Sequence, residues 1–407
     1  MICRDYELNL TFLKKYRMMY WTYQFTTIII VVFLSKEAQF NYLQKERNSM
    51  KIKSLFSLAT AAILSMGVAS TAVAEDKVLL KLPVWFGTHL TGLGSSPLFF
   101  ADTVNAASGG SIKVKIYEPG KLVATKEMLE SVSNGSVNSG WGTPGYNTGL
   151  LGKKAAIFSA VPFGPEAPEF MAWVYYGGGR DLWQKLYDDA GYNVHAVPCS
   201  IIAPETSGWF TKEINSPADL DGLRMRFFGL GANVMEKLGV TTSLLGSGDI
   251  MPALEKGAID ATEFSMPAID KLLGFPKLLK HNYYPGWHQP STMFDLIING
   301  DTWNGMSAAQ QATIESACKA TMLDGLALGE AIQFDYMKAN VESGVTNHYW
   351  SDEMLAIFRS SWDEVVAELI AEDPEFGEIY GHLNDFRANY KIWQEWIYLP
   401  RPSMQGQ

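Results

Sequence analysis

From Lys77 onward the sequence alternates short apolar segments with helical ones, and this alternation limits the fold more than any other feature. Residues 78–84 and 112–117 read as strands, and 112–117 alternates apolar and polar side chains as a half-buried strand does. A helix is expected over residues 91–108, ending before Gly109. Because a β-α-β-α order builds a mostly parallel sheet with helices on its faces, we expect an α/β fold.

The middle of the chain repeats this scheme. Strands are expected at 195–202, 208–211, 223–228, 242–245 and 259–264, with helices at 126–133, 231–238 and 249–256. Two α/β units joined by crossing segments predict two lobes around a central cleft, in which ligands bind at strand ends.

The last third of the chain is helical. A long helix is expected from Ser307 to Glu342, a second begins at the N-cap residue Ser351, and a third covers roughly 378–396, after Pro374 and Gly377. We expect lobe 1 mainly within residues 75–200, lobe 2 mainly within 201–300 with crossing strands, and a helical region within 301–407 that bridges the lobes.

Residues 50–74 have the three regions of a secretory signal peptide. Met50 is followed by Lys51 and Lys53, then by an apolar run over 55–68, and the segment ends in the small residues Ala72-Val73-Ala74. The sequence therefore predicts export to the periplasm with cleavage after Ala74.

Residues 1–49 do not fit a signal peptide that begins at Met50. Their apolar stretch, Phe25 to Leu34, has ten residues, whereas a membrane-spanning helix needs roughly 20. We expect this segment to be an upstream mis-start, with Met50 as the true initiator. The alternative is a genuine membrane anchor.

Charge and cysteine content exclude several classes of protein. The formal net charge is −10, which argues against nucleic-acid binding. The three cysteines, Cys3, Cys199 and Cys318, lack the spacing of a zinc or redox site. We expect Cys199 and Cys318 to be separate buried apolar residues, although an oxidising compartment would also permit a disulfide.

The strand around Arg226 is the first candidate for ligand chemistry. Arg224 and Arg226 share one face of this strand, and Met225 and Phe227 share the other. An arginine held between Met and Phe is costly to bury without a carboxylate partner. The residues leave open whether that partner is a ligand or another side chain of the protein.

Glu205 and Glu263 are the second candidate. Each glutamate follows an apolar strand beside small or aromatic residues, so both could lie at one edge of the cleft. Two carboxylates near an arginine suit a cation that bridges to an anionic ligand. They would equally suit the acid and base of a secreted hydrolase. No nucleophile-elbow, zincin or Walker motif accompanies them.

Several segments together resemble the DctP-type solute receptors of tripartite ATP-independent periplasmic (TRAP) transporters, and in particular the branch that binds 2-oxo and related monocarboxylic acids. The resemblance extends from about Val84 to Trp396. It is carried by the segments 159–164, 172–173, 177–179, 208–210, 222–228, 248–254, 259–263 and 283–288.

The resemblance implies a two-lobed periplasmic binding protein fold with a central cleft and long C-terminal connecting helices. It implies that Arg226 grips a ligand carboxylate and that a metal ion bridges the ligand to Glu205, Glu263 and the backbone of Phe264. In that branch a Gln usually stands where this chain has Glu205, and the additional carboxylate favours calcium over sodium. The pocket walls would come from Trp85, Tyr146, Phe163, Trp209 and Trp287, with His288 at the rim.

The function expected from this resemblance is a receptor, not an enzyme, that passes a 2-oxo or 2-hydroxy monocarboxylate to membrane-embedded permease subunits. No catalytic cofactor is expected, only a bound calcium or sodium ion. Homodimers through the C-terminal helices are a further expectation. The alternatives are a dicarboxylate receptor and, more remotely, a hydrolase that uses Glu205 and Glu263.

Overall fold

The computed structural model describes residues 76–399. The expected signal peptide 50–74 and the segment 1–49 lie outside the described residues, and so does the expected cleavage site at Ala74.

The first lobe is built on β1 (Val78–Pro83), β2 (Ile112–Tyr117), β3 (Ser139–Gly142), β4 (Val194–Ile202) and β10 (Thr292–Asn299). β1 pairs with β2 in parallel, and a parallel bridge joins Val84 to Trp141 of β3. β10 lies between β3 and β4 and is antiparallel to both. The helices of this lobe are α3 (Ser95–Ala107), α4 (Met128–Ser133), α5 (Thr148–Leu151), α6 (Ala167–Tyr176), α7 (Gly179–Asp189) and α11 (Gly300–Asn304), with short 3₁₀ turns at 125–127, 144–147 and 153–158.

The second lobe contains a six-stranded sheet of order β11-β9-β5-β8-β6-β7. Its strands are β5 (Gly208–Phe210), β6 (Arg224–Arg226), β7 (Thr241–Ser243), β8 (Ala261–Thr262), β9 (His281–Tyr284) and β11 (Thr346–Tyr349). Its helices are α8 (Gly231–Lys237), α9 (Ser247–Glu255) and α10 (Pro267–Leu273), with 3₁₀ turns at 217–219 and 275–277.

Each lobe has one strand that runs antiparallel to both of its neighbours in the sheet. In the first lobe this strand is β10, and in the second it is β5, which pairs antiparallel with both β8 and β9. Both strands directly follow a segment that passes from one sheet to the other, namely 203–207 before β5 and 285–291 before β10. The expected α/β order is therefore found, but the expectation of mostly parallel pairing was wrong: among the described strands four pairs are parallel and four are antiparallel. All four antiparallel pairs involve β5 or β10, the two strands that follow a crossing.

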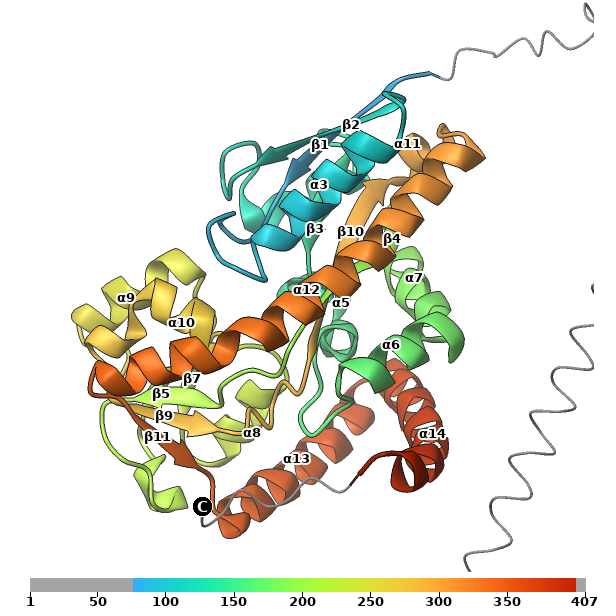
Figure 1. The fold of residues 1–407 in the computed structure, drawn as a ribbon. Coiled ribbons are helices and arrows are strands. Elements are labelled where there is room, and N and C mark those ends of the chain that lie inside the picture. The colour runs from blue at the N-terminus through green and yellow to red at the C-terminus, as the bar shows by residue number, and fades with distance from the viewer. Residues whose placement is uncertain (1–75, 400–407) are drawn as a thin grey trace, which may run out of the picture. The chain divides into compact units, whose positions relative to one another are not determined.

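The long helix α12 (Ala308–Glu342) runs beside both lobes, packing on α3 and β4 of the first and on α10 of the second (Figure 1). It starts where the sequence predicts, because the Ser307 hydroxyl accepts the backbone N–H of Gln310 and the Gln310 side chain caps Ser307 in return.

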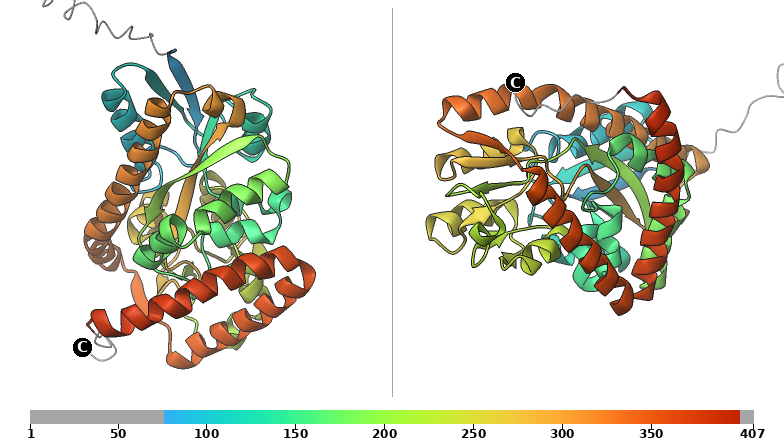
Figure 2. Two further views of the ribbon diagram at one scale, coloured as in Figure 1. Left: turned by 90° about the vertical axis from the view of Figure 1, so that its right-hand side faces the viewer. Right: turned by 90° about the horizontal axis from the view of Figure 1, so that it is seen from below.

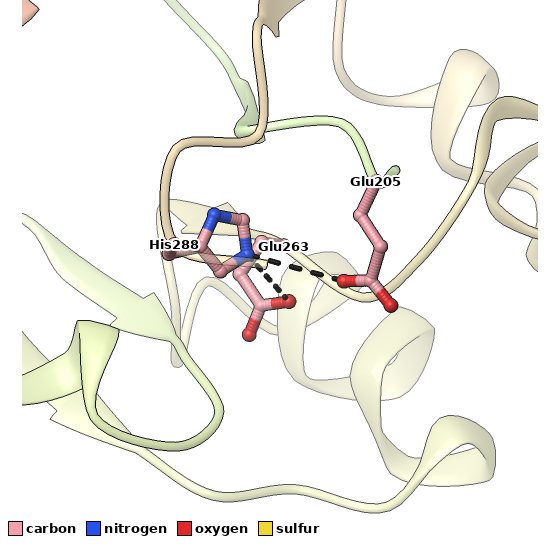
Figure 3. Close-up of side chains that lie close together, drawn as sticks. All are labelled: Glu205, Glu263 and His288. Carbon is pink, nitrogen blue, oxygen red and sulfur yellow. Dashed lines mark ion pairs between the residues drawn. The ribbon is translucent and has the colours of Figure 1, made fainter. Parts of the chain in front are cut away.

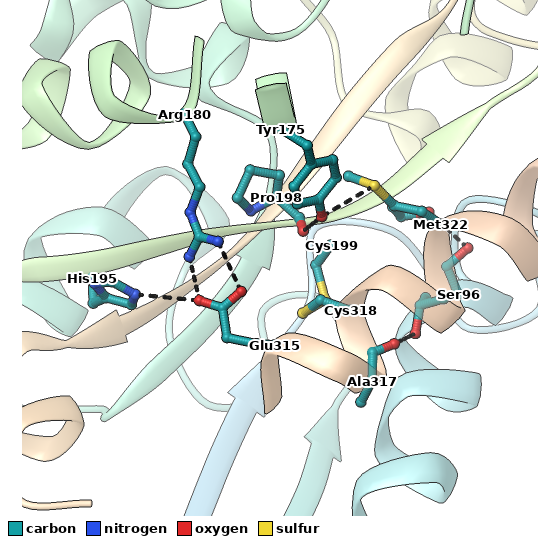
Figure 4. Close-up of a disulfide and its surroundings, with 12 residues drawn as sticks. Ser96, Tyr175, Arg180, His195, Pro198, Cys199, Glu315, Ala317, Cys318 and Met322 are labelled. Atoms are coloured by element: carbon teal, nitrogen blue, oxygen red, sulfur yellow. Dashed lines mark hydrogen bonds and ion pairs between the residues drawn. A yellow bond between two sulfur atoms is a disulfide. The ribbon is translucent and has the colours of Figure 1, made fainter. Parts of the chain in front are cut away.

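A disulfide joins Cys199 of β4 to Cys318 of α12 (Figure 4). The expectation of two separate buried cysteines was therefore wrong. α12 lies across β4 closely enough to bring the two Cα atoms to 4.2 Å, although 119 residues separate them in the chain. The bond fixes the bridging helix to a strand that leads into the other lobe.

Two further helices, α13 (Asp352–Glu372) and α14 (Pro374–Ile397), pack against each other and appear in red in Figure 2. α13 also contacts α8, and α14 contacts α6. The last helix begins at Pro374 rather than near residue 378, because proline is accepted at the first helical position and Asp373 caps the N–H of Glu375. Among residues 76–399, no helix is long and apolar enough to cross a membrane.

Candidate functional site

Arg226 and Glu263 lie side by side because they end neighbouring parallel strands. Arg226 closes β6 and pairs with Thr262 of β8, so that Glu263 follows at the same sheet edge. The carboxyl ends of parallel strands are where α/β proteins place ligands. Met225 is fully buried on the opposite face, as the strand alternation predicts.

The Arg226 guanidinium is fully buried and almost fully bonded. Nη1 donates to Oε1 of Glu263 and to the Glu263 carbonyl, both at 2.8 Å, and Nε donates to the carbonyl of Leu245. Nη2 donates to the hydroxyl of Tyr146, at 3.3 Å, which belongs to the first lobe. Arg224, by contrast, is exposed and paired with Asp260. The strand therefore turns Arg226, and not Arg224, toward the other lobe.

Glu205 lies on the crossing segment that leads from β4 to β5 and is buried. Its backbone is held between the two lobes, because the N–H of Glu205 reaches the carbonyl of Gln289 and the N–H of Thr206 reaches that of Ser265. Gly286 packs directly on this segment, and a Cβ there would meet the Glu205 carbonyl at 2.3 Å. Only glycine lets the two crossing segments approach this closely.

His288 lies on the other crossing segment and points between the two glutamates (Figure 3). Its Nε2 is 3.6 Å from Oε2 of Glu263 and 4.0 Å from Oε2 of Glu205. All three side chains are buried, and one ligand atom of each lies within 4.8 Å of the others. His288 was expected at the rim of the pocket, which is wrong, because the 285–291 crossing carries it into the interior.

The two glutamates differ in electrostatic state. Burial raises the pKa of Glu205 well above its usual value, and the charges of Glu263 and Asp270 raise it further. Burial also acts on Glu263, but Arg226 and the neighbouring His288 outweigh it and leave the pKa of Glu263 lowered. Without a further cation, the site therefore holds one ionised carboxylate paired with Arg226 and one carboxyl group that resists ionisation.

A small cavity of about 20 Å³ adjoins this cluster. It is enclosed by residues of both lobes and of both crossing segments: Phe86, Leu93, Thr143, Tyr146, Glu205, Phe228, Phe264, Gln289, Thr292 and Phe294. Trp85, an expected wall residue, stacks on Tyr146 with a centroid distance of 4.4 Å. Burial raises the pKa of Tyr146 to about 12, so its hydroxyl stays protonated. Larger hollows occur on the surface, for example one of about 530 Å³ beside α5, α7 and α14, but they lack this cluster.

Of the five expected aromatic wall residues only Tyr146 lines the cavity; Trp85 lies behind it, and the other three lie elsewhere. Trp209 is a core residue, whose indole N–H donates to Asp270 at 2.7 Å. Phe163 and Trp287 stack on each other, and the Arg359 guanidinium lies 4.0 Å from the Phe163 ring. These rings support the crossing segments from behind instead of facing a ligand.

Asp270 was not singled out from the sequence, yet it organises the site. Its Oδ2 accepts hydrogen bonds from Thr206 and Trp209, and its Oδ1 accepts the backbone N–H of Ser265. It thereby ties together the segments that carry Glu205 and Glu263. Burial raises the pKa of Asp270 well above its usual value. The only sequence signal was a single acid directly after the apolar run 266–269.

The donor set fits a metal ion. Oε2 of Glu205, Oε2 of Glu263 and both ring nitrogens of His288 are buried without a hydrogen-bond partner among the described residues. Buried polar atoms are normally bonded, and an ion held between them satisfies the two carboxylate oxygens and one ring nitrogen at once. The Phe264 ring lies beside Arg226, 4.9 Å from its guanidinium carbon.

The family model DctP, described as bacterial extracellular solute-binding protein, family 7, matches residues 89–373. A curated relative from Nostoc sp. strain PCC 7120, named a monocarboxylate 2-oxoacid-binding periplasmic protein, is 33% identical over 295 residues, covering 72% of this chain and 80% of the relative. The chain belongs to the DctP family of bacterial extracellular solute-binding proteins, which confirms the resemblance seen in the sequence.

Solved structures agree with this assignment. A TRAP transporter solute-binding protein from Bordetella bronchiseptica RB50, described as a dimer with calcium and picolinate, has a TM-score of 0.75 and 29% identity over 78% of this chain and 94% of its own. One from Pseudoalteromonas atlantica T6c, with bound sodium and pyruvate, has a TM-score of 0.75 and 27% identity over 79% of this chain and 97% of its own. The expected two-lobed α/β receptor fold is thereby confirmed.

Proposed function

We propose that this protein is the extracytoplasmic receptor of a TRAP transporter, which captures a small 2-oxo or 2-hydroxy monocarboxylate and delivers it to the membrane permease. The observation that carries this proposal is the buried cluster of Arg226, Glu263 and Glu205, which adjoins a cavity enclosed by both lobes. Relatives with the same fold are described with pyruvate or picolinate and a cation.

Arg226 supplies the anion-binding group. Nη2 is the part of its guanidinium that is left for a ligand carboxylate, because Nε and Nη1 already donate to Leu245 and Glu263. The ligand carboxylate binds at Nη2 beside the Tyr146 hydroxyl, whose own bond to that nitrogen is long, at 3.3 Å. A cation held by Glu205 and Glu263 then binds the 2-oxo or 2-hydroxy oxygen, and calcium and sodium are the ions described in relatives.

A monocarboxylate fits the cavity better than the alternative dicarboxylate does. A second ligand carboxylate needs its own cationic partner, and among the described residues no Lys or Arg lines the cavity. The volume of about 20 Å³ holds about one water-sized group, so a ligand of even a few heavy atoms requires the lobes to open.

A receptor also explains the two glutamates better than a hydrolase does. A retaining glycosidase holds its carboxyl groups about 5 Å apart on either side of a sugar, and an inverting enzyme holds them farther apart. Here Glu205 and Glu263 offer oxygen atoms within 4.8 Å of each other and of a His288 ring nitrogen, which is the arrangement of a shared cation site rather than of two groups that flank a substrate. We therefore infer binding without turnover.

Export and assembly belong to the same proposal. Cleavage after Ala74 would release the described part of the chain into the periplasm, in keeping with the extracellular family to which it belongs. We also propose a homodimer through α14, because its last turns expose a row of apolar side chains and a relative is described as a dimer. The exposed residues are Ile392, Trp393, Trp396, Ile397 and Leu399.

Calorimetry tests the proposal. Chelator-treated protein, dialysed into sodium-free buffer, is titrated with pyruvate, lactate and succinate, each with and without calcium or sodium. We expect pyruvate or lactate to bind when a cation is present, succinate to bind more weakly, and no product to form on long incubation. Absence of binding by every small carboxylate under all cation conditions would overturn the proposed function.

A further inference from the structure

Three ligand atoms surround a gap at the centre of the site. The Nε2 of His288 lies 3.6 Å from Glu263 and 4.0 Å from Glu205, too far for a hydrogen bond to either. All three donor atoms lie within 4.8 Å of one another, so a slight movement of the side chains lets one ion reach each of them at metal–ligand bond lengths of about 2.0–2.2 Å.

His288 itself has no bonding partner in the interior. Its side chain is fully buried, and neither ring nitrogen is hydrogen-bonded within residues 76–399. A buried polar group without a partner costs about 1–3 kcal/mol, so an imidazole in this position calls for an explanation beyond packing. Because the ring points toward the Glu205 and Glu263 carboxylates, the explanation is an ion bound between the three side chains (Figure 3).

The chemical type of the third donor selects the ion. Sodium and calcium are hard cations that take oxygen ligands, whereas a neutral imidazole nitrogen suits divalent ions from manganese to zinc. We propose that His288 is a third side-chain ligand beside Glu205 and Glu263, and that this site takes a divalent transition-metal ion in preference to calcium or sodium. The inference rests on the proposed receptor function and specifies the cation of that same site.

The charges of the site agree with a divalent ion. Arg226 contributes one positive charge, and Glu205 and Glu263 together contribute two negative charges when both are ionised. A divalent cation and one monocarboxylate ligand then make the buried cluster neutral, whereas a monovalent ion leaves a net negative charge that burial penalises.

The rival arrangement is a protonated His288 that replaces the metal. An imidazolium between two carboxylates forms short charge-assisted hydrogen bonds, of about 2.7–2.9 Å. The separations of 3.6 and 4.0 Å are longer than that and leave room for an ion. The experiment below separates the two arrangements.

The test compares metal affinities of the full exported protein after chelation. Calorimetry measures Mn²⁺, Zn²⁺ and Ca²⁺ binding in the presence of pyruvate, for the wild type, His288→Gln and the control His89→Gln, which changes an exposed histidine. We expect one Zn²⁺ or Mn²⁺ per chain, bound more tightly than Ca²⁺. His288→Gln should lose at least about tenfold in Zn²⁺ affinity without losing Ca²⁺ affinity, and His89→Gln should match the wild type.

A spectroscopic measurement identifies the metal ligands in the wild type itself, so that its result does not depend on whether the variant folds. X-ray absorption at the zinc edge should show the outer-shell scattering of one imidazole, and His288→Gln should lack it. An all-oxygen shell, or pyruvate binding that is unaffected by any divalent ion, would overturn the inference. The receptor proposal would still stand in that case if pyruvate binds with calcium or sodium, and it would fail only if no carboxylate binds at all.

Discussion

Arg226 and Glu263 form an ion pair at 2.8 Å in which both side chains are shielded almost completely from solvent. Arg226 therefore has two roles. It neutralises the buried Glu263 carboxylate, and its Nη2 nitrogen donates to Tyr146 of the first lobe. Breaking such a pair by removing one partner typically costs about 3–5 kcal/mol, because the other charge is left buried alone. In an Arg226→Ala variant, a loss of ligand affinity could therefore not be distinguished from a loss of stability.

Arg226→Lys is the more informative substitution. It keeps the charge beside Glu263 but removes the planar fork that holds a carboxylate. We expect pyruvate binding to weaken by about 10–100-fold, the equivalent of one charge-assisted hydrogen bond, and the unfolding midpoint to fall less than in Arg226→Ala, because the charge beside Glu263 is kept although the bond to Leu245 is lost. Calorimetry and thermal unfolding measure the two effects. Arg224→Lys, at the exposed pair with Asp260, is the control and should behave as the wild type.

Tyr146→Phe removes a hydrogen bond between the lobes. The Tyr146 hydroxyl reaches Arg226 from the first lobe, and its ring remains supported by the stack on Trp85. We expect a roughly three- to tenfold loss in pyruvate affinity with an unchanged melting temperature, since a single hydrogen bond contributes about 1 kcal/mol. Tyr176→Phe, on an exposed side chain, serves as the control. A loss of melting temperature equal to the loss of affinity would instead assign Tyr146 a packing role.

The strand-helix order could be predicted from the sequence because it depends on local alternation, whereas the roles given to Arg226, Glu205 and Glu263 came from the family resemblance and stay predictions. Alternation placed Arg224 and Arg226 on one strand face and did not predict that Arg224 is exposed while Arg226 is buried. The position of His288 could not be predicted, because it depends on two crossing segments packed together at Gly286. Asp270 was missed for a similar reason, since its partners, Thr206, Trp209 and Ser265, come from separate segments.

The aromatic residues show the same limit. Trp85 follows an apolar strand and Trp209 lies within one, yet Trp85 stacks on a residue of the cavity wall and Trp209 is a core residue bonded to Asp270. Composition places an aromatic ring in the interior but does not say which interior surface it covers. The disulfide between Cys199 and Cys318 likewise depends on how α12 crosses β4.

The disulfide should contribute strongly to stability. It closes a loop across a sequence separation of 119 residues, and removing a native disulfide typically costs about 2–5 kcal/mol. We expect the double substitution Cys199→Ala, Cys318→Ala to lower the urea midpoint of unfolding by a corresponding amount, and a reductant to lower the wild-type midpoint but not that of the variant. Equal midpoints for the two proteins under oxidising conditions would contradict the role assigned to this bond.

Charge on the last turns of α14 should prevent the proposed dimer. Trp393→Glu with Trp396→Glu places two carboxylates in the exposed apolar row, where a second copy of the chain would bury them at high cost. We expect sedimentation to give a dimer for the wild type and a monomer for the variant, with pyruvate affinity unchanged. Tyr176→Glu, on another exposed aromatic residue, controls for a general effect of surface charge. A wild type that remains monomeric at high concentration would exclude the dimer.

Asp295 should make stability depend on pH in a direction opposite to ordinary acid unfolding. It is buried in β10, where Tyr187 donates to its Oδ2 at 2.7 Å and Trp183 at 3.3 Å. Burial raises its pKa to about 6, and these two donors offset only part of that effect. Because an unfolded aspartate has a pKa of about 3.9, the native state binds the proton more tightly, and stability falls as the pH rises from about 4 to about 6.

Asp295→Asn should remove this contribution, since a neutral amide oxygen can accept the same two hydrogen bonds. A pKa shift of about two units corresponds to a free energy of unfolding of roughly 3 kcal/mol. The stability of the variant relative to the wild type should therefore rise by about this amount between pH 4 and pH 6 and stay constant above pH 6. Urea unfolding at pH 4, 5, 6 and 7 measures the difference between the two proteins, which removes the contributions of Glu205 and Asp270 because both proteins share them. Parallel stability curves would show that Asp295 is already ionised in the native state at pH 4, and an unstable variant would show that the Tyr187 and Trp183 bonds require a carboxylate.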